Sequence, residues 1–190
     1  MPETLADQKE QLRQHHHFLR RSLQPNEWRS ESRLIIKRLL ETEKYQQASS
    51  IHTYVSMEKN REVNTTDLIA ESLKREKRVV VPRMTDDGKL THHSINSIQQ
   101  LKKNRWGVME PENVREISID ASTLIIVPML AADFKRNRLG YGKGYYDRFL
   151  SQVDSYKIGL CYSFNLSWTP LPSEPFDIKM DTVVTGQFTI

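Results

Sequence analysis

The chain has 190 residues, of which 37% are hydrophobic, and a chain of this length can bury roughly 70% of its unfolded surface in one domain. Its 28 basic and 24 acidic residues leave a formal charge of +4, which favours an anionic partner. The single cysteine excludes an internal disulfide, and the longest apolar run, residues 124–132, is far too short to cross a bilayer. The sequence shows no secretory signal pattern. We expect a cytoplasmic monomer with no membrane segment.

Two helices are predicted within the first 45 residues. Leucines recur at helical spacing from Leu5 to Leu23, and Gln24-Pro25-Asn26 interrupts the pattern. Asn26 can cap the second helix. The apolar face of that helix carries Trp28, Leu34, Ile35 and Leu39.

The middle of the chain alternates between strand and helix patterns. Residues 51–57 alternate apolar and polar side chains, which predicts a strand, and residues 65–77 return to helical spacing. The apolar run 79–81, which a proline ends, is typical of a strand covered on both faces. A polar strand at 90–95 and a loop region through Pro111 are expected to follow.

The C-terminal part begins with the most apolar strand candidate, residues 123–128. A helix at 144–153, a strand at 157–162 and a last strand at 182–185 follow. This alternation predicts an α/β fold with a mostly parallel, Rossmann-like open sheet, helices on both faces, and the two N-terminal helices in addition. We expect a single α/β domain over residues 1–190.

The stretch RLGYGKGYYDRF, residues 138–149, holds three of the 7 glycines of the chain at alternate positions. It lies between the central strand and a helix, which is where ligands bind in open α/β sheets. Glycines let backbone N–H groups approach a ligand, and the first turn of a helix attracts phosphate. Arg138, Lys143 and Arg148 add positive charge. The stretch therefore predicts a phosphate-binding loop.

Other interpretations of the charged and glycine-rich stretches remain open at this point. The glycine spacing matches neither a Walker A loop nor a dinucleotide fingerprint, and an ordinary turn with core-packed tyrosines is the alternative. Basic clusters at 74–78 and 102–105 could contact nucleic acid, but acidic residues are interleaved and no RNA- or DNA-binding motif accompanies them. We interpret these clusters as solvated helix ends and loops.

Several conspicuous side chains are assigned structural roles. The run from His15 to His17 is expected on a solvated helix surface, because metal ligands on one helix face need i, i+4 spacing. His92-His93 is interpreted as structural, and Cys161 as part of the core. Trp28 and Trp168 are expected to pack against the core.

The string from Arg138 to Asp147, with Ile126-Val127-Pro128 and Asp133 before it, resembles the signature of the 5-formyltetrahydrofolate cyclo-ligases, also called methenyltetrahydrofolate synthetases. The resemblance covers nearly the whole chain. Its other blocks are KEQLR at 9–13, YVSM at 54–57 with EVNT at 62–65, VPR at 81–83, WGVMEP at 106–111, and PSEPFD at 172–177 with Asp181. Arg136 stands where the family usually has Gly, and Asn165 lies near the position of a family Gln that contacts the pocket.

The resemblance implies a ligase of one-carbon metabolism that uses ATP and Mg²⁺ to cyclise 5-formyltetrahydrofolate to 5,10-methenyltetrahydrofolate, releasing ADP and phosphate. Transfer of the γ-phosphoryl group onto the formyl oxygen would create a leaving group, and the neighbouring amine of the folate would close the ring. Such chemistry needs positioning and charge neutralisation rather than a protein nucleophile. The expected partners are therefore small molecules, ATP and a reduced folate. The alternative is a non-catalytic nucleotide- or RNA-binding module on the same fold.

The resemblance also implies roles for individual residues. Catalytic roles fall to Arg138, Lys143 and Tyr145. The ATP contacts are Lys9, Arg13, Arg138, Leu139, Gly140, Tyr141, Gly142, Lys143, Gly144, Tyr145 and Tyr146. The folate contacts are Val55, Met57, Glu62, Trp106, Tyr145 and Tyr146. Asp147 and Asp177 offer the oxygen ligands that Mg²⁺ prefers, although Asp177 could instead cap the turn before the last strand.

Overall fold

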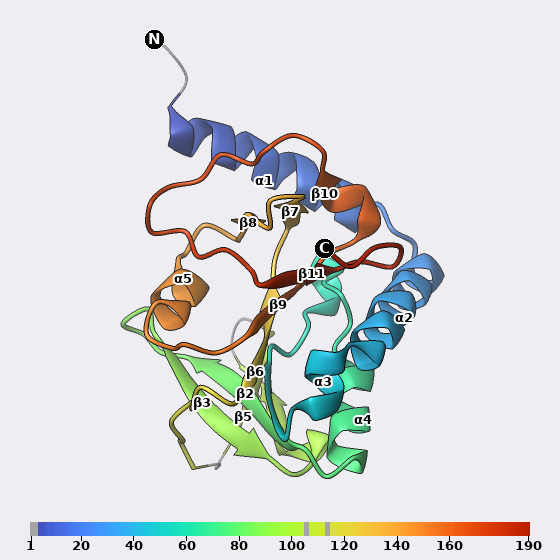
Figure 1. Cartoon of the computed structure of the whole chain (residues 1–190), viewed down its shortest axis with the longest axis vertical. Helices are drawn as coiled ribbons and strands as arrows, with labels where there is room; N and C mark the ends of the chain where they lie inside the picture. The colour runs from blue at the N-terminus through green and yellow to red at the C-terminus, as the bar shows by residue number, and fades with distance from the viewer. Residues whose placement is uncertain (1–3, 105–106, 113–114) are drawn as a thin grey trace.

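The computed structural model describes residues 4–104, 107–112 and 115–190 (Figure 1). The helices are α1 (Leu5–Arg21), α2 (Pro25–Glu41), α3 (Glu43–Gln47), α4 (Thr66–Lys74) and α5 (Tyr145–Leu150), with 3₁₀ turns η1 (Glu58–Asn60), η2 (Ile98–Gln100) and η3 (Ser163–Asn165). The strands are β1 (Ser50–Thr53), β2 (Arg78–Met84), β3 (Leu90–Ile95), β4 (Leu101–Lys103), β5 (Met109–Pro111), β6 (Leu124–Pro128), β7 (Ala131–Asp133), β8 (Arg138–Leu139), β9 (Lys157–Leu160), β10 (Leu166–Ser167) and β11 (Thr182–Val184).

The central sheet has six strands in the order β11-β9-β6-β1-β2-β3. All neighbours in it are parallel except β2 and β3, which pair antiparallel. Helices α2, α3 and α4 lie on one side of the sheet, α5 lies on the other, and α1 crosses one end (Figure 1). The mostly parallel α/β sheet with helices on both faces is therefore confirmed.

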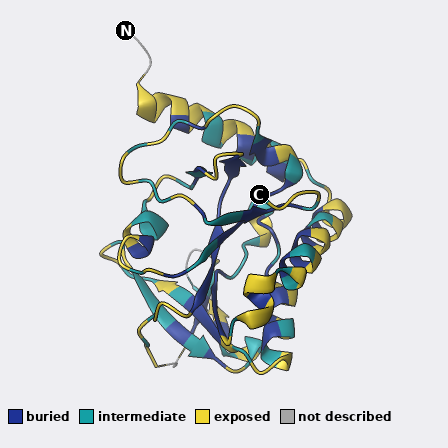
Figure 2. Ribbon diagram, viewed as in Figure 1, coloured by how far each residue is buried: buried dark blue, intermediate teal, exposed yellow. Residues whose placement is uncertain are grey.

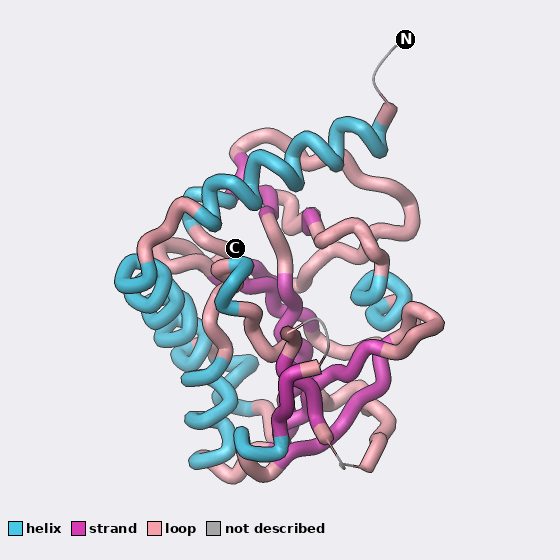
Figure 3. The backbone as a smooth tube through the Cα atoms, turned by 180° about the vertical axis from the view of Figure 1, so that it is seen from behind, coloured by secondary structure: helices cyan, strands magenta, loops and turns pink. Residues whose placement is uncertain are grey.

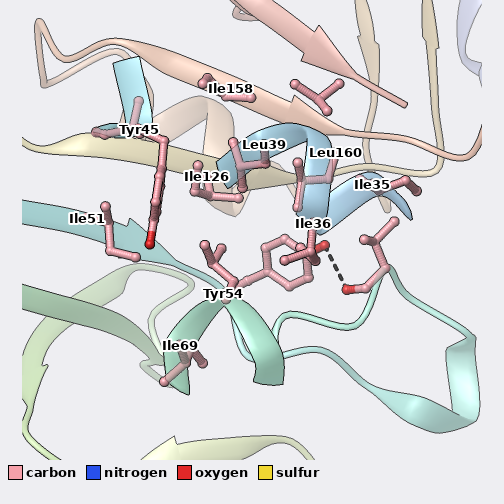
Figure 4. Close-up of a cluster of buried hydrophobic side chains, with 14 of the residues drawn as sticks. Ile35, Ile36, Leu39, Tyr45, Ile51, Tyr54, Ile69, Ile126, Ile158 and Leu160 are labelled. Carbon is pink, nitrogen blue, oxygen red and sulfur yellow. Dashed lines mark hydrogen bonds between the residues drawn. The ribbon is translucent and has the colours of Figure 1, made fainter. Parts of the chain in front are cut away.

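The hydrophobic core lies on both faces of this sheet. Between the sheet and α2–α4 it contains Ile35, Leu39 and Ile126, which point toward one another (Figure 4). Under α5 a second cluster includes Ile125 and Phe149. Figure 2 shows the central strands in the colour of buried residues and the outer faces of α1 and α2 as exposed.

This double coverage corrects the prediction of an alternating strand over residues 51–57. The strand β1 ends at Thr53, and all four of its residues are buried, including His52. A strand in the middle of a parallel sheet has helices on both faces, so neither face is solvated.

The start of α2 and the region after β3 also differ from the predictions. Gln24 rather than Asn26 caps α2, because Pro25 occupies the first helical position and the Gln24 N–H donates to the Glu27 carboxylate at 2.8 Å. Leu34 lies on the exposed side of the helix.

Two small sheets, β4-β5 and β10-β7-β8, have strands of two or three residues, which are too short to leave a recognisable period in the sequence.

The loops that leave the strands gather between the sheet and α1, as the view from behind shows (Figure 3). Among the described residues, no helix combines the length and the apolar character that a membrane crossing needs. An open α/β sheet binds its ligands among the loops at one end of its strands. The loops next to α1 are therefore the place to look for a site (Figure 3).

Candidate active site

A cavity of about 560 Å³ lies at the carboxyl ends of β1, β2 and β6. We call it the central cavity, and by chemistry its lining residues form two groups, which we name its charged half and its apolar half. The charged half is lined by Lys9, Arg13, Arg138, Gly140, Tyr141, Gly142, Lys143, Gly144, Asp147, Glu174 and Asp177. The apolar half is lined by Tyr54, Val55, Met57, Glu62, Met84, Leu90, Val108, Met109, Glu110 and Tyr146.

The structure brings nearly all of the predicted site residues to this one cavity. Lys9 and Arg13 of α1, the whole run from Arg138 to Asp147, and Asp177 line it. Of the predicted folate contacts, Val55, Met57, Glu62, Tyr145 and Tyr146 also line it. Trp106 lies outside the described residues. Lys9 and Asp177 are in contact although they are 168 positions apart in the chain.

The glycine loop, residues 140–144, curves tightly around arginine side chains. Gly142 and Gly144 have φ values of +87° and +66°, which favour glycine. A Cβ atom at Gly142 would lie 3.1 Å from the guanidinium carbon of Arg13, so a larger residue would be strained by the backbone conformation and would also press on the Arg13 side chain. The Arg13 side chain fixes the loop further, because its Nε donates to the Gly140 carbonyl at 3.1 Å.

The cations and carboxylates of the charged half are paired with each other. Arg138 Nη2 lies 2.7 Å from Asp147 Oδ1, and the arginine side chain is only 5% exposed. Lys9 Nζ lies 2.6 Å from Asp177 Oδ2 and 2.6 Å from Glu174 Oε2. Burial by itself would lower the pKa of Lys9, but its hydrogen bonds to these two carboxylates raise the pKa overall. An anionic ligand could therefore replace carboxylates as the partner of these cations.

Asp177 makes the turn-capping bond that its sequence context allowed, and it also lines the central cavity. Its Oδ2 accepts the Glu174 N–H at 2.7 Å, which is the turn-capping bond of the alternative interpretation. The same carboxylate faces Lys9 in the central cavity and is 20% exposed there. The Asp147 carboxylate is tied to the same segment, since its Oδ1 accepts the Ile178 N–H at 3.3 Å.

The apolar half contains two buried carboxylates, those of Glu62 and Glu110. Glu62 Oε2 accepts the Met57 N–H at 2.6 Å, and the residue is 7% exposed. Burial raises the pKa of Glu62, while the charge of Arg20 opposes that rise. The hydroxyl of Tyr146 is buried without a hydrogen-bond partner among the described residues. A buried polar atom without a partner beside an apolar cavity indicates a place for a ligand with polar edges.

Several residues outside the cavity differ from the predictions. His16 is buried, and its Nδ1 lies 3.1 Å from Asn165 Oδ1, so the histidine run is not a wholly solvated surface. Asn165 also donates to the Leu130 carbonyl at 2.8 Å and does not line the cavity. Trp168 is 79% exposed, which contradicts its predicted packing. Cys161 is buried as expected, and burial raises its pKa to about 12.

Arg136, which replaces the usual glycine of the family signature, keeps the backbone conformation that glycine favours. Its φ is +63°. Its side chain donates to the Asp181 carbonyl at 3.0 Å, and its own carbonyl accepts the Met180 N–H at 3.1 Å. These bonds hold the left-handed conformation in place, so the loop shape does not depend on a glycine here.

The 5-formyltetrahydrofolate cyclo-ligase family matches residues 6–186 of this chain. The chain belongs to this family. Relatives include the probable 5-formyltetrahydrofolate cyclo-ligase of Schizosaccharomyces pombe, 31% identical with 85% of this chain and 86% of the relative covered. The 5-formyltetrahydrofolate cyclo-ligase of Mus musculus is also 31% identical and covers 86% of each chain. The predicted membership of an enzyme family, the cyclo-ligases, is thus confirmed.

Solved structures of cyclo-ligases share the fold. The 5,10-methenyltetrahydrofolate synthetase of Aquifex aeolicus superimposes with a TM-score of 0.83 at 31% identity, over 95% of this chain and 91% of that one. The synthetase of Mycoplasma pneumoniae, at 24% identity, gives a TM-score of 0.73 and supports the fold alone. The arrangement of sheet and helices is therefore that of the family.

Proposed function

We propose that the chain catalyses the ATP-dependent cyclisation of 5-formyltetrahydrofolate to 5,10-methenyltetrahydrofolate, with release of ADP and phosphate. The observation that carries this proposal is that a cation-rich half with a glycine loop and an apolar half with a buried carboxylate line a single cavity. Two substrates of matching chemistry could therefore react without leaving it. The names of the relatives in yeast and mouse support the same reaction.

The charged half suits the triphosphate of ATP. Backbone N–H groups of the glycine loop can approach phosphate oxygens, and Lys9, Arg13 and Arg138 supply positive charge from two segments. Lys143 is exposed at the loop and has freedom to reach a terminal phosphate. We assign catalytic roles to Arg138, Lys143 and Tyr145, because phosphoryl transfer depends on positioning and charge neutralisation around the transferred group.

The carboxylates of the charged half fit a magnesium ion in their chemistry. Asp147 and Asp177 both line the cavity and offer hard oxygen ligands. In the described part of the chain, no three or more His, Cys, Asp or Glu side chains are grouped so that they could hold a metal ion by themselves. When bound, Mg²⁺ would neutralise phosphate charge.

The apolar half suits the pteridine ring of a reduced folate. Val55 and Met57 offer apolar contacts, and Glu62 and Tyr146 offer polar atoms to the ring edge. Trp106 stays a prediction for this half. With the ring held there and the formyl group directed toward the glycine loop, the oxygen would accept the γ-phosphoryl group. The neighbouring folate nitrogen would then attack the formyl carbon, and phosphate would leave.

The test is the absorbance of the methenyl product after the protein is mixed with ATP, Mg²⁺ and 5-formyltetrahydrofolate. We expect product only when all components are present, with one phosphate released for each folate converted. Rapid ATP hydrolysis without folate, or tight RNA binding without product, would contradict the proposal and favour a different activity. A cytoplasmic location and a monomeric state stay predictions, and a relative in Arabidopsis thaliana is named as mitochondrial.

A further inference from the structure

Arg20, near the end of α1, is a buried cation that no motif of the sequence indicates. It is 1% exposed. Its Nε donates to the Asn60 carbonyl at 2.7 Å, and its Nη1 donates to the Met129 carbonyl at 3.3 Å. Its guanidinium carbon lies 5.3 Å from the centre of the Tyr141 ring. One side chain therefore contacts η1, the segment after β6, and the glycine loop.

These contacts connect the two halves of the central cavity. Asn60 and Glu62 belong to the segment that lines the apolar half, whereas Tyr141 lies between two glycines of the loop in the charged half. Arg20 itself does not line the cavity. Any effect of Arg20 on a ligand must therefore pass through the residues that it holds.

The charges around Glu62 give Arg20 a second role. Glu62 interacts with Arg20 from α1, with Tyr141 from the glycine loop, and with the Met57 N–H. Tyr54, Tyr146 and Tyr162 also interact with it, and burial raises the pKa of each of these tyrosines, so they stay neutral. Among these groups Arg20 carries the only positive charge. A buried carboxylate is costly without a nearby cation, so the charged state of Glu62 depends on Arg20, which also holds the Asn60 carbonyl two residues before it.

We propose that Arg20 is a positioning residue that fixes Glu62 and Tyr141 together, so that the folate site and the glycine loop are formed as one unit. This inference rests on the proposed function, because it takes Glu62 as the polar contact of the folate. The expected signature is a change in the KM for folate that exceeds the change in kcat, because Arg20 holds the binding site without touching the reacting atoms.

The main experiment compares Arg20→Met with Arg21→Met in steady-state kinetics with varied folate and saturating ATP. Arg21 is the neighbouring exposed arginine, and its Nη2 contacts the side-chain oxygen of Asn60 at 3.4 Å, so both variants lose one charge near the same residue. We expect Arg20→Met to raise the KM for folate about ten- to hundredfold. Arg21→Met should change it by less than about twofold, because exposed contacts contribute little.

A double-mutant cycle separates this role from a loss of structure. In the Glu62→Gln background no buried charge remains to be held, so Arg20→Met should raise the KM for folate much less than in the wild type. Equal effects in both backgrounds would overturn the proposal. A pH profile adds an independent readout. Without Arg20 the pKa of Glu62 rises further, so the KM of Arg20→Met should still improve with increasing pH in a range where the KM of the wild type is already constant.

Arg20→Lys covers the case in which the methionine variant does not fold. The lysine keeps the positive charge but cannot donate to Asn60 and Met129 from a planar group, so an intermediate KM for folate is expected. If either variant, Arg20→Lys or Arg20→Met, folds and has the KM for folate of the wild type, the proposal is overturned. If the wild-type protein itself forms no methenyl product, the proposed function fails instead, and the two failures are distinguishable.

Discussion

In the charged half of the central cavity, the buried cations Lys9 and Arg138 are paired with partly exposed carboxylates. In the apolar half, the buried carboxylates of Glu62 and Glu110 lie among apolar and tyrosine side chains. Lys9 contacts two carboxylates at 2.6 Å, so its partners can be exchanged for phosphate oxygens with little change in charge. The partners of the Glu62 carboxylate cannot be exchanged for a ligand in this way. Burial raises the pKa of Glu62, and the charge of Arg20 opposes that rise.

The comparison teaches that the two halves should respond to different perturbations. Where partners are exchangeable, a substitution should change the dependence on ATP and Mg²⁺ and leave the folded state nearly intact. Where a charge is buried, a substitution should change stability and folate binding together. The predictions below follow from this difference.

The largest effect is expected from Asp177→Asn in the charged half. The variant keeps the shape of the side chain and removes one anionic ligand for Mg²⁺. Loss of even an outer partner of a metal ligand costs about 10- to 100-fold, so kcat should fall by roughly a hundredfold or more at low Mg²⁺ and recover in part when Mg²⁺ is raised. The measurement is activity against Mg²⁺ concentration.

Asp181→Asn is the matched control for this prediction. Asp181 also accepts one backbone N–H, from Lys157 at 2.7 Å, and also pairs with a lysine, Lys157 Nζ at 3.1 Å. It does not line the central cavity. Similar losses of Mg²⁺ dependence in both variants, or a loss explained by early melting of Asp177→Asn, would favour the turn-capping role alone.

Glu62→Gln tests the apolar half and should separate stability from binding. We expect the KM for folate to rise roughly ten- to hundredfold, because a charged hydrogen-bond partner of the ring is lost, while the KM for ATP stays within about twofold. Thermal stability should be followed in the same variant, because Glu62→Gln removes a buried carboxylate and at the same time leaves Arg20 without its counter-charge.

The pH dependence of stability gives the sign of this effect. The pKa of Glu62 in the folded protein lies above its ordinary value of 4.5. Its contribution to the free energy of unfolding is therefore present below pH 4.5 and is lost as the pH rises through the folded pKa. Thermal unfolding of both proteins should show Glu62→Gln gaining on the wild type as the pH increases. A constant difference from pH 4 to 8 would mean that Glu62 is not strained by burial.

Lys143→Met should have a smaller effect, limited to the nucleotide. Lys143 is exposed, so the variant removes a charge without disturbing the packing of the glycine loop. The KM for ATP should rise about tenfold, the lower end of what a charge-assisted contact contributes, because Lys9, Arg13 and Arg138 share the phosphate charge. An unchanged KM for ATP at saturating folate would show that the loop acts through its backbone alone.

The smallest effect concerns a histidine pair under α5. His52 Nε2 lies 3.1 Å from His92 Nδ1, and the His92 ring packs on Phe149 with centroids 4.3 Å apart. Burial lowers the pKa of His92 from 6.5 to about 4, and lowers that of His52 as well. The unfolded chain protonates these two histidines more readily than the folded protein does. Their contribution to the free energy of unfolding is therefore present above pH 6.5 and is lost as the pH falls toward 4.

His92→Gln removes one of the two titrating rings and keeps a polar side chain. At pH 7 the wild type should melt at a higher temperature than the variant. At pH 4.5 this difference in melting temperature should be smaller by about 2–4 °C, which corresponds to about 1 kcal/mol in a chain of this size. His15→Gln, on the exposed face of α1, is the control. If the two variants lose stability in parallel with the wild type, the pair does not contribute to acid sensitivity.

The sequence alone determined the elements whose signals are local. Continuous apolar runs gave the buried parallel strands β2 and β6, and helical spacing with Pro25 separated α1 from α2. Glycines at 140, 142 and 144 indicated the loop, because glycine readily adopts the positive φ values that tight turns use. Together with the order of the family motifs, these signals predicted one site for Lys9, the glycine loop and Asp177.

Only the tertiary structure decided which charges are buried and which residues hold them. Arg20 and Arg21 are neighbours of the same type in the sequence, yet one is 1% exposed and the other lies on the surface. His16 is buried between two exposed or partly exposed histidines, and Trp168 is exposed despite its size. Burial of a charge depends on partners from distant segments, here Asn60, Met129 and Tyr141 around Arg20. Those partners are brought together only when the sheet and α1 pack, because the free energy that compensates for desolvation comes from contacts that no local pattern contains.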